Sequence, residues 1–192
     1  MDWDAKYRAG DIPWQRPALH PAFDHWFGGE NGCRLKSLNI LIPGCGTASE
    51  PVAFARLGAN VTCLDLAPAA VEAQKRMMMK EGLPVTVLLT NILKWRPQKP
   101  VDMIYEQTCL CAVDPQERAE YERFAVESLK QAGSLYALFM QSEGIIGPPF
   151  HCELSDMRDV FPPSRWKWPE TTPARFDHPK GMFELGFVLE RT

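Results

Sequence analysis

Short apolar runs alternate with helical patterns along most of the chain after residue 38. The first run, Leu38–Ile42, stops at Pro43-Gly44, and the second, Val61–Leu64, stops at Asp65. Strands that alternate with helices are typical of a parallel sheet covered by helices on both faces. The other runs expected to form parallel strands are Val85–Leu89, Val101–Tyr105 and Leu135–Met140.

Residues that start and stop helices lie between these runs. Thr47-Ala48-Ser49-Glu50 fits a capping box, in which a Thr hydroxyl and a Glu carboxylate satisfy the first turn. Pro68 suits the first turn of a helix expected to run to about Glu81, where Gly82 can end it. Asp114-Pro115 predicts another helix start, with Gly133 as its end.

The C-terminal part breaks the alternation. A short helix near Leu154–Phe161 precedes two strand-like segments, Arg165–Trp168 and Phe183–Leu189, and a Pro-rich loop joins them. We expect these two segments to form an antiparallel pair at the sheet edge, and we assign no structure to the loop Pro169–Lys180. The predicted fold class is therefore α/β, with a doubly wound, mostly parallel sheet and an antiparallel edge pair at the C-terminus.

The first 36 residues stand apart because they are rich in aromatic side chains. They hold six of the twenty aromatic residues of the chain: Trp3, Tyr7, Trp14, Phe23, Trp26 and Phe27. Such a segment must pack against something. It either covers a helix face or forms a lid over a ligand site.

Composition narrows the class of protein. A chain of 192 residues favours one domain, here residues 1–192, and a net charge of −3 weighs against a protein held to nucleic acid by phosphate neutralisation. No apolar run approaches 18 residues and no signal peptide is visible, so we expect a cytoplasmic protein. The six cysteines and four histidines lack metal-ligand spacing, so no metal is expected.

The turn after the first strand carries the candidate chemistry. Gly44-Cys45-Gly46 lies between a strand and a helix, where glycine lets the backbone turn sharply and approach a ligand. Asp65 ends the second strand, 19 residues after Gly46, and a carboxylate there can accept hydrogen bonds from two ribose hydroxyls. This arrangement predicts a nucleotide-like ligand.

Two ligands fit this turn. A nicotinamide dinucleotide usually needs a third glycine, but Ser49 stands at that position. S-adenosylmethionine has no phosphate and demands less of the turn. The chain also leaves only about fifty residues after the fifth strand, too few for the substrate domain of a dehydrogenase. S-adenosylmethionine is therefore favoured; an NAD-dependent oxidoreductase and a non-catalytic protein that keeps this fold remain alternatives.

Several motifs resemble the thiopurine S-methyltransferase-like family of class I S-adenosylmethionine-dependent methyltransferases, and the Pro-Gly-Cys-Gly turn is closer to its thiol and halide branch. The resemblance covers nearly the whole chain. The matching segments are Trp3-x-x-x-Tyr7, Gly10–Trp14, Leu41–Gly46, Asp102–Glu106, Cys111–Pro115, Arg118 and Gly147–Phe150.

The resemblance implies roles for individual residues. The cofactor-binding set comprises Trp3, Tyr7, Trp14, Gly44, Cys45, Gly46, Asp65, Leu66, Asn91, Ile92, Glu106 and Gln107. Glu106 is also the candidate catalytic residue, and Phe150, Arg118 and His151 are candidate substrate contacts. Asn91 departs from the Asp that is common in the family, so its amide or the Ile92 backbone would contact the adenine.

Plainer interpretations compete with several of these roles. Arg118 has three glutamates near it on the same predicted helix and could form a surface ion pair, while His151 could be an incidental surface residue. Cys109 and Cys111 are expected in the core. DNA-base methyltransferases carry an Asn/Asp-Pro-Pro-aromatic motif after the fourth strand, and Glu106-Gln107-Thr108-Cys109 stands there instead. The sequence therefore predicts methyl transfer to a small molecule, with a thiol or another soft nucleophile favoured.

Overall fold

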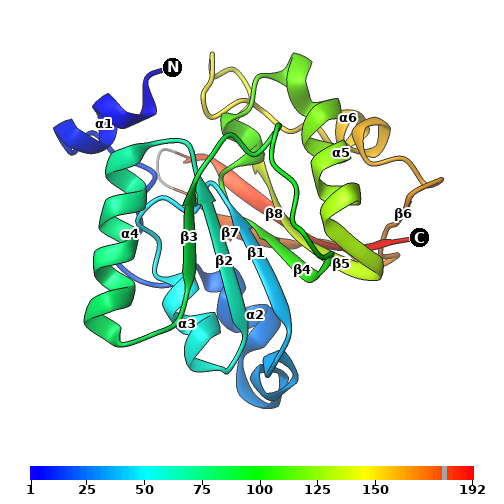
Figure 1. Ribbon diagram of the computed structural model, residues 1–192. Helices are drawn as coiled ribbons and strands as arrows, with labels where there is room; N and C mark the ends of the chain where they lie inside the picture. The colour runs from blue at the N-terminus through cyan, green and yellow to red at the C-terminus, as the bar shows by residue number, and fades with distance from the viewer. Residues whose placement is uncertain (179–180) are drawn as a thin grey trace. The chain divides into compact units, whose positions relative to one another are not determined.

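The computed structural model describes residues 1–178 and 181–192, which form two compact units, Met1–Trp95 and Arg96–Thr192 (Figure 1). The assignment of residues 1–192 to one domain stays a prediction. No helix of the described ranges is long and apolar enough to cross a membrane.

The first unit contains three parallel strands. They are β1 (Asn39–Pro43), β2 (Asn60–Asp65) and β3 (Thr86–Leu89), and β2 pairs with both neighbours. Most of their side chains are buried, which explains the continuous apolar runs in the sequence, because strands covered on both faces do not alternate. All three strands were predicted within one or two residues.

Two helices follow β1 and β2. The second, α4 (Pro68–Glu81), has the predicted bounds, and Gly82 ends it in the left-handed conformation at φ 65°. The first, α3 (Glu50–Arg56), begins two residues later than the capping box requires, and Ser49 before it makes no capping hydrogen bond. The predicted capping box is wrong because Glu50 instead accepts the backbone N–H of His20 at 2.7 Å.

The aromatic N-terminal segment packs against two different helices, α3 and α4. It contains α1 (Trp3–Ala9), α2 (Pro21–Phe27) and a 3-10 helix, η1 (Gly29–Leu35). Phe23 and Phe27 of α2 pack edge-on against Phe54 of α3, with ring centroids 4.8 and 5.1 Å apart. This part of the segment covers a helix face, which is the first of the two arrangements expected from the sequence. Helix α1 lies beside α4 instead (Figure 1).

The second unit combines parallel and antiparallel strands. Strand β4 (Val101–Glu106) is parallel to β5 (Leu129–Gln141), and β8 (Phe183–Arg191) is antiparallel to β5. Strands β6 (Trp166–Lys167) and β7 (Ala174–Asp177) both pair antiparallel with β8. The predicted C-terminal pair is confirmed. Strand β7 was missed inside Pro169–Lys180, of which Pro179 and Lys180 lie outside the described residues.

The helices of the second unit begin at the predicted signals. Asp114 accepts the N–H of Gln116 at 2.9 Å and starts a 3-10 turn, η3 (Pro115–Glu117), which leads into α5 (Arg118–Ser128). A further 3-10 turn, η2 (Leu110–Ala112), follows β4, and α6 (Leu154–Val160) follows β5.

The prediction that α5 ends at Gly133 is wrong. Helix α5 ends at Ser128, and β5 already begins at Leu129. Gly133 lies inside β5, where the register against β4 shifts between Val101 and Met103. A Cβ there would lie 2.8 Å from the carbonyl oxygen of Lys130, so glycine serves a close backbone approach at a bulge.

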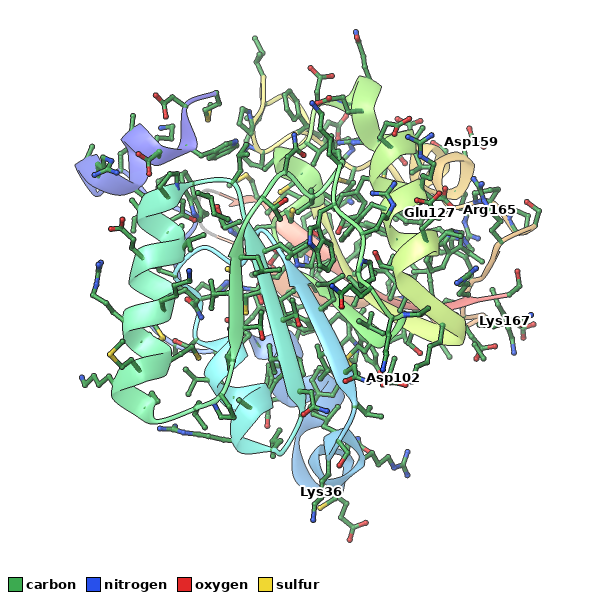
Figure 2. All side chains as sticks on the ribbon, viewed as in Figure 1. Lys36, Asp102, Glu127, Asp159, Arg165 and Lys167 are labelled. Atoms are coloured by element: carbon green, nitrogen blue, oxygen red, sulfur yellow. The ribbon has the colours of Figure 1, made fainter. Side chains whose placement is uncertain are left out.

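Charged side chains gather on the outside of the second unit. Figure 2 labels Glu127, Asp159, Arg165 and Lys167 around α5, α6 and β6, and all four are exposed. Arg165 pairs at 2.8 Å with Glu122, a buried carboxylate that also accepts the indole N–H of Trp166 at 2.7 Å. These contacts attach β6 to α5.

Candidate active site

The turn after β1 is tied to the end of β2 by two hydrogen bonds. Cys45 N–H donates to the carbonyl of Leu64 at 3.0 Å, and Gly46 N–H donates to Oδ2 of Asp65 at 2.8 Å. Gly44 and Gly46 have φ of 57° and 51°, a backbone conformation that residues with a Cβ rarely adopt. The two glycines therefore allow a turn whose backbone bonds directly to the candidate ribose-binding carboxylate.

Asp65 is 7% exposed and already accepts hydrogen bonds from the backbone. Its Oδ1 accepts the N–H of Ala67 at 2.9 Å, and its Oδ2 accepts that of Gly46. Burial raises its pKa, and the backbone hydrogen bonds oppose that shift. The backbone N–H of Leu66 is a third donor to this carboxylate. A carboxylate offers about four acceptor positions, so it keeps some capacity for a hydroxyl donor.

Three predicted aromatic residues come together against this turn. Trp14 lies edge-on to Trp3 and to Tyr7, with centroids 5.5 and 5.9 Å apart, and its indole N–H donates to the Tyr7 hydroxyl at 3.3 Å. A Cβ added at Gly46 would lie 2.4 Å from the Tyr7 hydroxyl oxygen. Tyr7 therefore lies directly against Gly46, with Trp14 packed on Tyr7 and Trp3 packed on Trp14.

The remaining candidates of the first unit follow β2 and β3. Leu66, next to Asp65, is 54% exposed although it is apolar. The backbone N–H of Thr90 donates to the carbonyl of Asp65 at 2.8 Å, which brings the end of β3 to the end of β2. Asn91 uses its side-chain oxygen to accept the N–H of Leu93 at 2.9 Å, and Ile92 is half-buried. The side-chain oxygen of Asn91 thus stabilises the loop that follows β3.

Glu106, the candidate catalytic residue, lies inside the second unit at 1% exposure. Its Oε1 accepts the N–H groups of Cys109 and Leu110 at 2.9 and 2.8 Å, and its Oε2 accepts that of Leu138 at 3.2 Å. Burial raises its pKa to about 7. The three hydrogen bonds lower the pKa and so oppose this shift, while the charge of Glu184 raises it slightly further. The carboxylate therefore holds the loop after β4 to β5.

Gln107 comes directly after this carboxylate and is half-buried. Its side-chain oxygen accepts the hydroxyl of the buried Tyr105 at 3.0 Å, which fixes the amide. Thr108 follows with φ of 57°. The loop after β4 is thus held by side chains on both sides of its turn.

Phe150 lies in a loop that several hydrogen bonds fix. Its N–H donates to the carbonyl of Cys111 at 2.7 Å, and the hydroxyl of Ser142 donates to the carbonyl of Pro149 at 3.0 Å. A Cβ at Gly147 would lie 2.5 Å from Cδ1 of Phe150, so the ring packs against that glycine. The ring is half-buried and is not one of the core residues.

His151 has both ring nitrogens engaged. Its Nδ1 accepts the backbone N–H of Ser142 at 3.1 Å, and its Nε2 lies 3.2 Å from Oε2 of Glu153. A backbone amide can only donate, so Nδ1 carries no proton and Nε2–H donates to the carboxylate. These two contacts fix the His151 ring within the loop.

Arg118 is buried, at 4% exposure, rather than part of a surface ion pair. Its Nη2 donates to the carbonyl of His151 at 2.9 Å and contacts Sγ of Cys152 at 3.6 Å. Its buried Nε has no hydrogen-bond partner within the described ranges. Arg118 and the Phe150 loop are thus brought together, but the sequence did not reveal Ser142 and Cys111 as supports, since no local signal marks them.

Comparisons with known proteins agree with these features. The sequence model of the family "Thiopurine S-methyltransferase (TPMT)" matches residues 1–182. The chain is 30% identical to a probable thiol methyltransferase 2 of Arabidopsis thaliana over 164 residues, covering 84% of this chain and 71% of that protein. It is 27% identical to a thiocyanate methyltransferase 1 of Brassica oleracea, covering 96% and 82%.

Solved structures show the fold. The Burkholderia thailandensis 1,6-didemethyltoxoflavin-N1-methyltransferase, crystallised with S-adenosylhomocysteine, superposes with a TM-score of 0.78 at 17% identity, covering 100% of this chain and 86% of that one. Magnesium protoporphyrin IX methyltransferase of Synechocystis gives 0.73 at 12% identity, covering 98% and 97%. These matches confirm the predicted fold class. The chain belongs to the thiopurine S-methyltransferase family of S-adenosylmethionine-dependent methyltransferases.

Proposed function

We propose that this protein transfers the methyl group of S-adenosylmethionine to a small thiol or another soft nucleophile. The observation that carries the proposal is the set formed by the glycine turn, Asp65 and the Tyr7 hydroxyl against Gly46. The names of the relatives, which include thiol and thiocyanate methyltransferases, favour a sulfur acceptor.

The first unit supplies groups suited to each part of the cofactor. Asp65 would use its remaining acceptor capacity for the ribose hydroxyls. The exposed Leu66 would offer an apolar surface to the adenine together with Ile92. Trp3, Tyr7 and Trp14 offer aromatic faces to a sulfonium, a favourable cation–π contact. Gly44, Cys45 and Gly46 would line the ribose and methionine part, and Asn91 would stand at the adenine.

The reaction needs little from the protein beyond alignment. The cofactor supplies a methyl group on a sulfonium, which is a good leaving group. A bond forms between the acceptor sulfur and the methyl carbon as the carbon–sulfonium bond breaks, and the proton of the thiol goes to solvent. A thiol with a pKa of about 8.5 is partly ionised at neutral pH, so a strong base is not required. Proximity and in-line orientation can supply several kcal/mol.

The titratable groups of the second unit fit a reaction without a protein base. Both nitrogens of His151 are engaged, and three backbone N–H groups occupy the oxygens of Glu106. We therefore assign Glu106 a positioning role: it holds the turn that presents Gln107. Phe150 would be a wall for the acceptor, and Arg118 would position the Phe150 loop through the carbonyl of His151.

Two measurements test the proposal. Calorimetric titrations with S-adenosylhomocysteine and NADH should show binding of the first alone. Initial rates with small thiols, thiocyanate, a halide and a thiopurine, followed by formation of S-adenosylhomocysteine, should be highest with a sulfur acceptor. Tight S-adenosylhomocysteine binding with no turnover on any acceptor would favour a non-catalytic protein. Binding of NADH alone would contradict the proposal altogether.

A further inference from the structure

Helix α4 lacks a cap of its own. Ala67 stands at its N-cap position and offers no side-chain acceptor, and the first turn contains no acidic residue. The first N–H groups of a helix have no partner within it and carry partial positive charge, so an acceptor there stabilises the end. The acceptor in this protein comes from a distant segment.

Asp4 of α1 supplies that acceptor. Its Oδ1 accepts the N–H of Ala69 at 2.7 Å, across 65 positions of the sequence. Its Oδ2 accepts the Nε–H of Arg8 at 2.6 Å. The bond to Arg8, and to a lesser degree that to Ala69, lowers the pKa of Asp4, so the carboxylate is charged at neutral pH.

The same helix end carries the candidate ribose-binding carboxylate. Asp65 accepts the N–H of Ala67, two residues before the Asp4 contact at Ala69. One turn along α1 from Asp4, the Tyr7 hydroxyl lies against Gly46, whose N–H donates to Asp65. The contact that fixes α1 is therefore next to the groups that α1 covers.

Two further polar contacts of α1 lie within the N-terminal segment. Asp2 accepts the N–H of Ala5 at 3.0 Å and caps α1 itself, and Lys6 pairs with Asp11 at 2.5 Å. These bonds maintain the shape of α1 but do not attach it to α4. Asp2 therefore offers a matched control for Asp4, since both are acidic residues at the start of the same helix.

We propose that Asp4 is a latch residue that holds α1 and its aromatic side chains closed over the cofactor site. This inference rests on the proposed function. If only the closed form binds the cofactor well, the observed affinity falls in proportion to the fraction of closed molecules. Asp4 is thus a positioning residue: it acts through Tyr7, Trp3 and Trp14, and does not itself touch the cofactor.

Four variants separate the latch from the other functions of α1. Asp4→Ala removes both of its contacts, and Asp4→Asn keeps an oxygen for Ala69 N–H but loses the charge. Arg8→Gln removes the ion pair with Asp4 and a weaker attraction to Glu72 of α4. Asp2→Ala weakens the cap of α1. For each, the readouts are the dissociation constant of S-adenosylhomocysteine by calorimetry, the melting temperature, and the rate of chymotrypsin cleavage after Tyr7 or Trp14.

We expect Asp4→Ala to raise the dissociation constant roughly tenfold and to speed cleavage, because an acceptor for a charge-assisted hydrogen bond is lost. Asp4→Asn should keep most of the affinity, and Arg8→Gln and Asp2→Ala should stay within about twofold of the wild type. Unchanged affinity in Asp4→Ala, even with a lower melting temperature, would reduce Asp4 to a structural cap and overturn the latch. An equal loss in Asp2→Ala would overturn it too.

The outcome for the latch can be told apart from that for the proposed function. If the wild type fails to bind S-adenosylhomocysteine, the proposed function fails, whatever the variants do. In that case faster cleavage of Asp4→Ala than of Asp2→Ala would still show that Asp4 holds α1, and equal cleavage would show that it does not.

Discussion

Two buried carboxylates, Asp65 and Glu106, accept backbone N–H groups at the ends of β2 and β4. Burial raises the pKa of both. They differ in access from solvent: Asp65 is 7% exposed and Glu106 is 1% exposed. Asp65 is therefore the better candidate for ligand contact, and Glu106 for fixing a turn.

Asp65→Ala should weaken S-adenosylhomocysteine binding by roughly 1–3 kcal/mol, the usual cost of leaving polar partners unsatisfied. The same change leaves the N–H groups of Gly46 and Ala67 without their acceptor, so the melting temperature should also fall. Affinity must be measured on the folded variant, checked by circular dichroism. An unchanged dissociation constant in a folded variant would remove Asp65 from the cofactor site.

Glu106 predicts a pH dependence of stability. Its pKa in the folded protein is about 7, above the ordinary value of 4.5, so the folded state holds a proton that the unfolded state releases between these values. That contribution is present below pH 4.5 and is lost as the pH rises through 7, by at most about 3 kcal/mol. The melting temperature should fall between pH 5 and 8.

Glu106→Gln gives the control for this dependence. An amide does not titrate, so the melting temperature of the variant should change less between pH 5 and 8. Asp65 and Glu122 also have raised pKa values and leave a residual slope of the same sign. Parallel curves for the variant and the wild type would show that Glu106 does not titrate in this range.

Single residues could be predicted where the local sequence restricts the backbone conformation. Gly44, Gly46 and Asp65 could be identified because a sharp turn between a strand and a helix needs glycine, and a strand end places one side chain. The burial of Glu106 and Arg118 could not, since it depends on the N–H and carbonyl groups of Leu138 and His151, far along the chain.

The loop between β5 and α6 is the element that should govern the acceptor. Phe150→Ala should raise KM or lower kcat for the acceptor and leave S-adenosylhomocysteine affinity nearly intact, since the ring is half-buried in a loop that its backbone already fixes. Ile146→Ala, at a fully exposed position of the same loop, is the control. A loss of roughly 3–5 kcal/mol of stability with normal activity would instead assign Phe150 to the core.

Helix α1 should be the element that responds to the cofactor. We expect chymotrypsin to cleave after Tyr7 or Trp14 more slowly when S-adenosylhomocysteine is present, because the bound molecule would add contacts to the aromatic side chains. The measurement is the rate of appearance of the shortened chain by mass spectrometry. Equal rates with and without the ligand would make the segment a static cover rather than a lid.

Elements were predicted well where local signals agree with long-range pairing. Pro68 and Gly82 bound α4 as expected because both act on the backbone of the helix that they limit. Gly133 misled the prediction of the end of α5, since the pairing of β4 with β5 decides the conformation there. Strand β7 escaped prediction because its pairing with β8 outweighs a proline-rich context.

For the molecule as a whole, binding of the cofactor should appear as stability. A ligand that binds only the folded state stabilises it by about 2.7 kcal/mol at a hundred times its dissociation constant. In a protein of 192 residues that corresponds to a rise in melting temperature of roughly 5–10 °C. S-adenosylhomocysteine should produce this rise, and NADH at the same concentration should not. Asp65→Ala should show a smaller rise at equal ligand concentration, because the dissociation constant increases. A rise with NADH and none with S-adenosylhomocysteine would contradict the use of the glycine turn that is proposed for this fold.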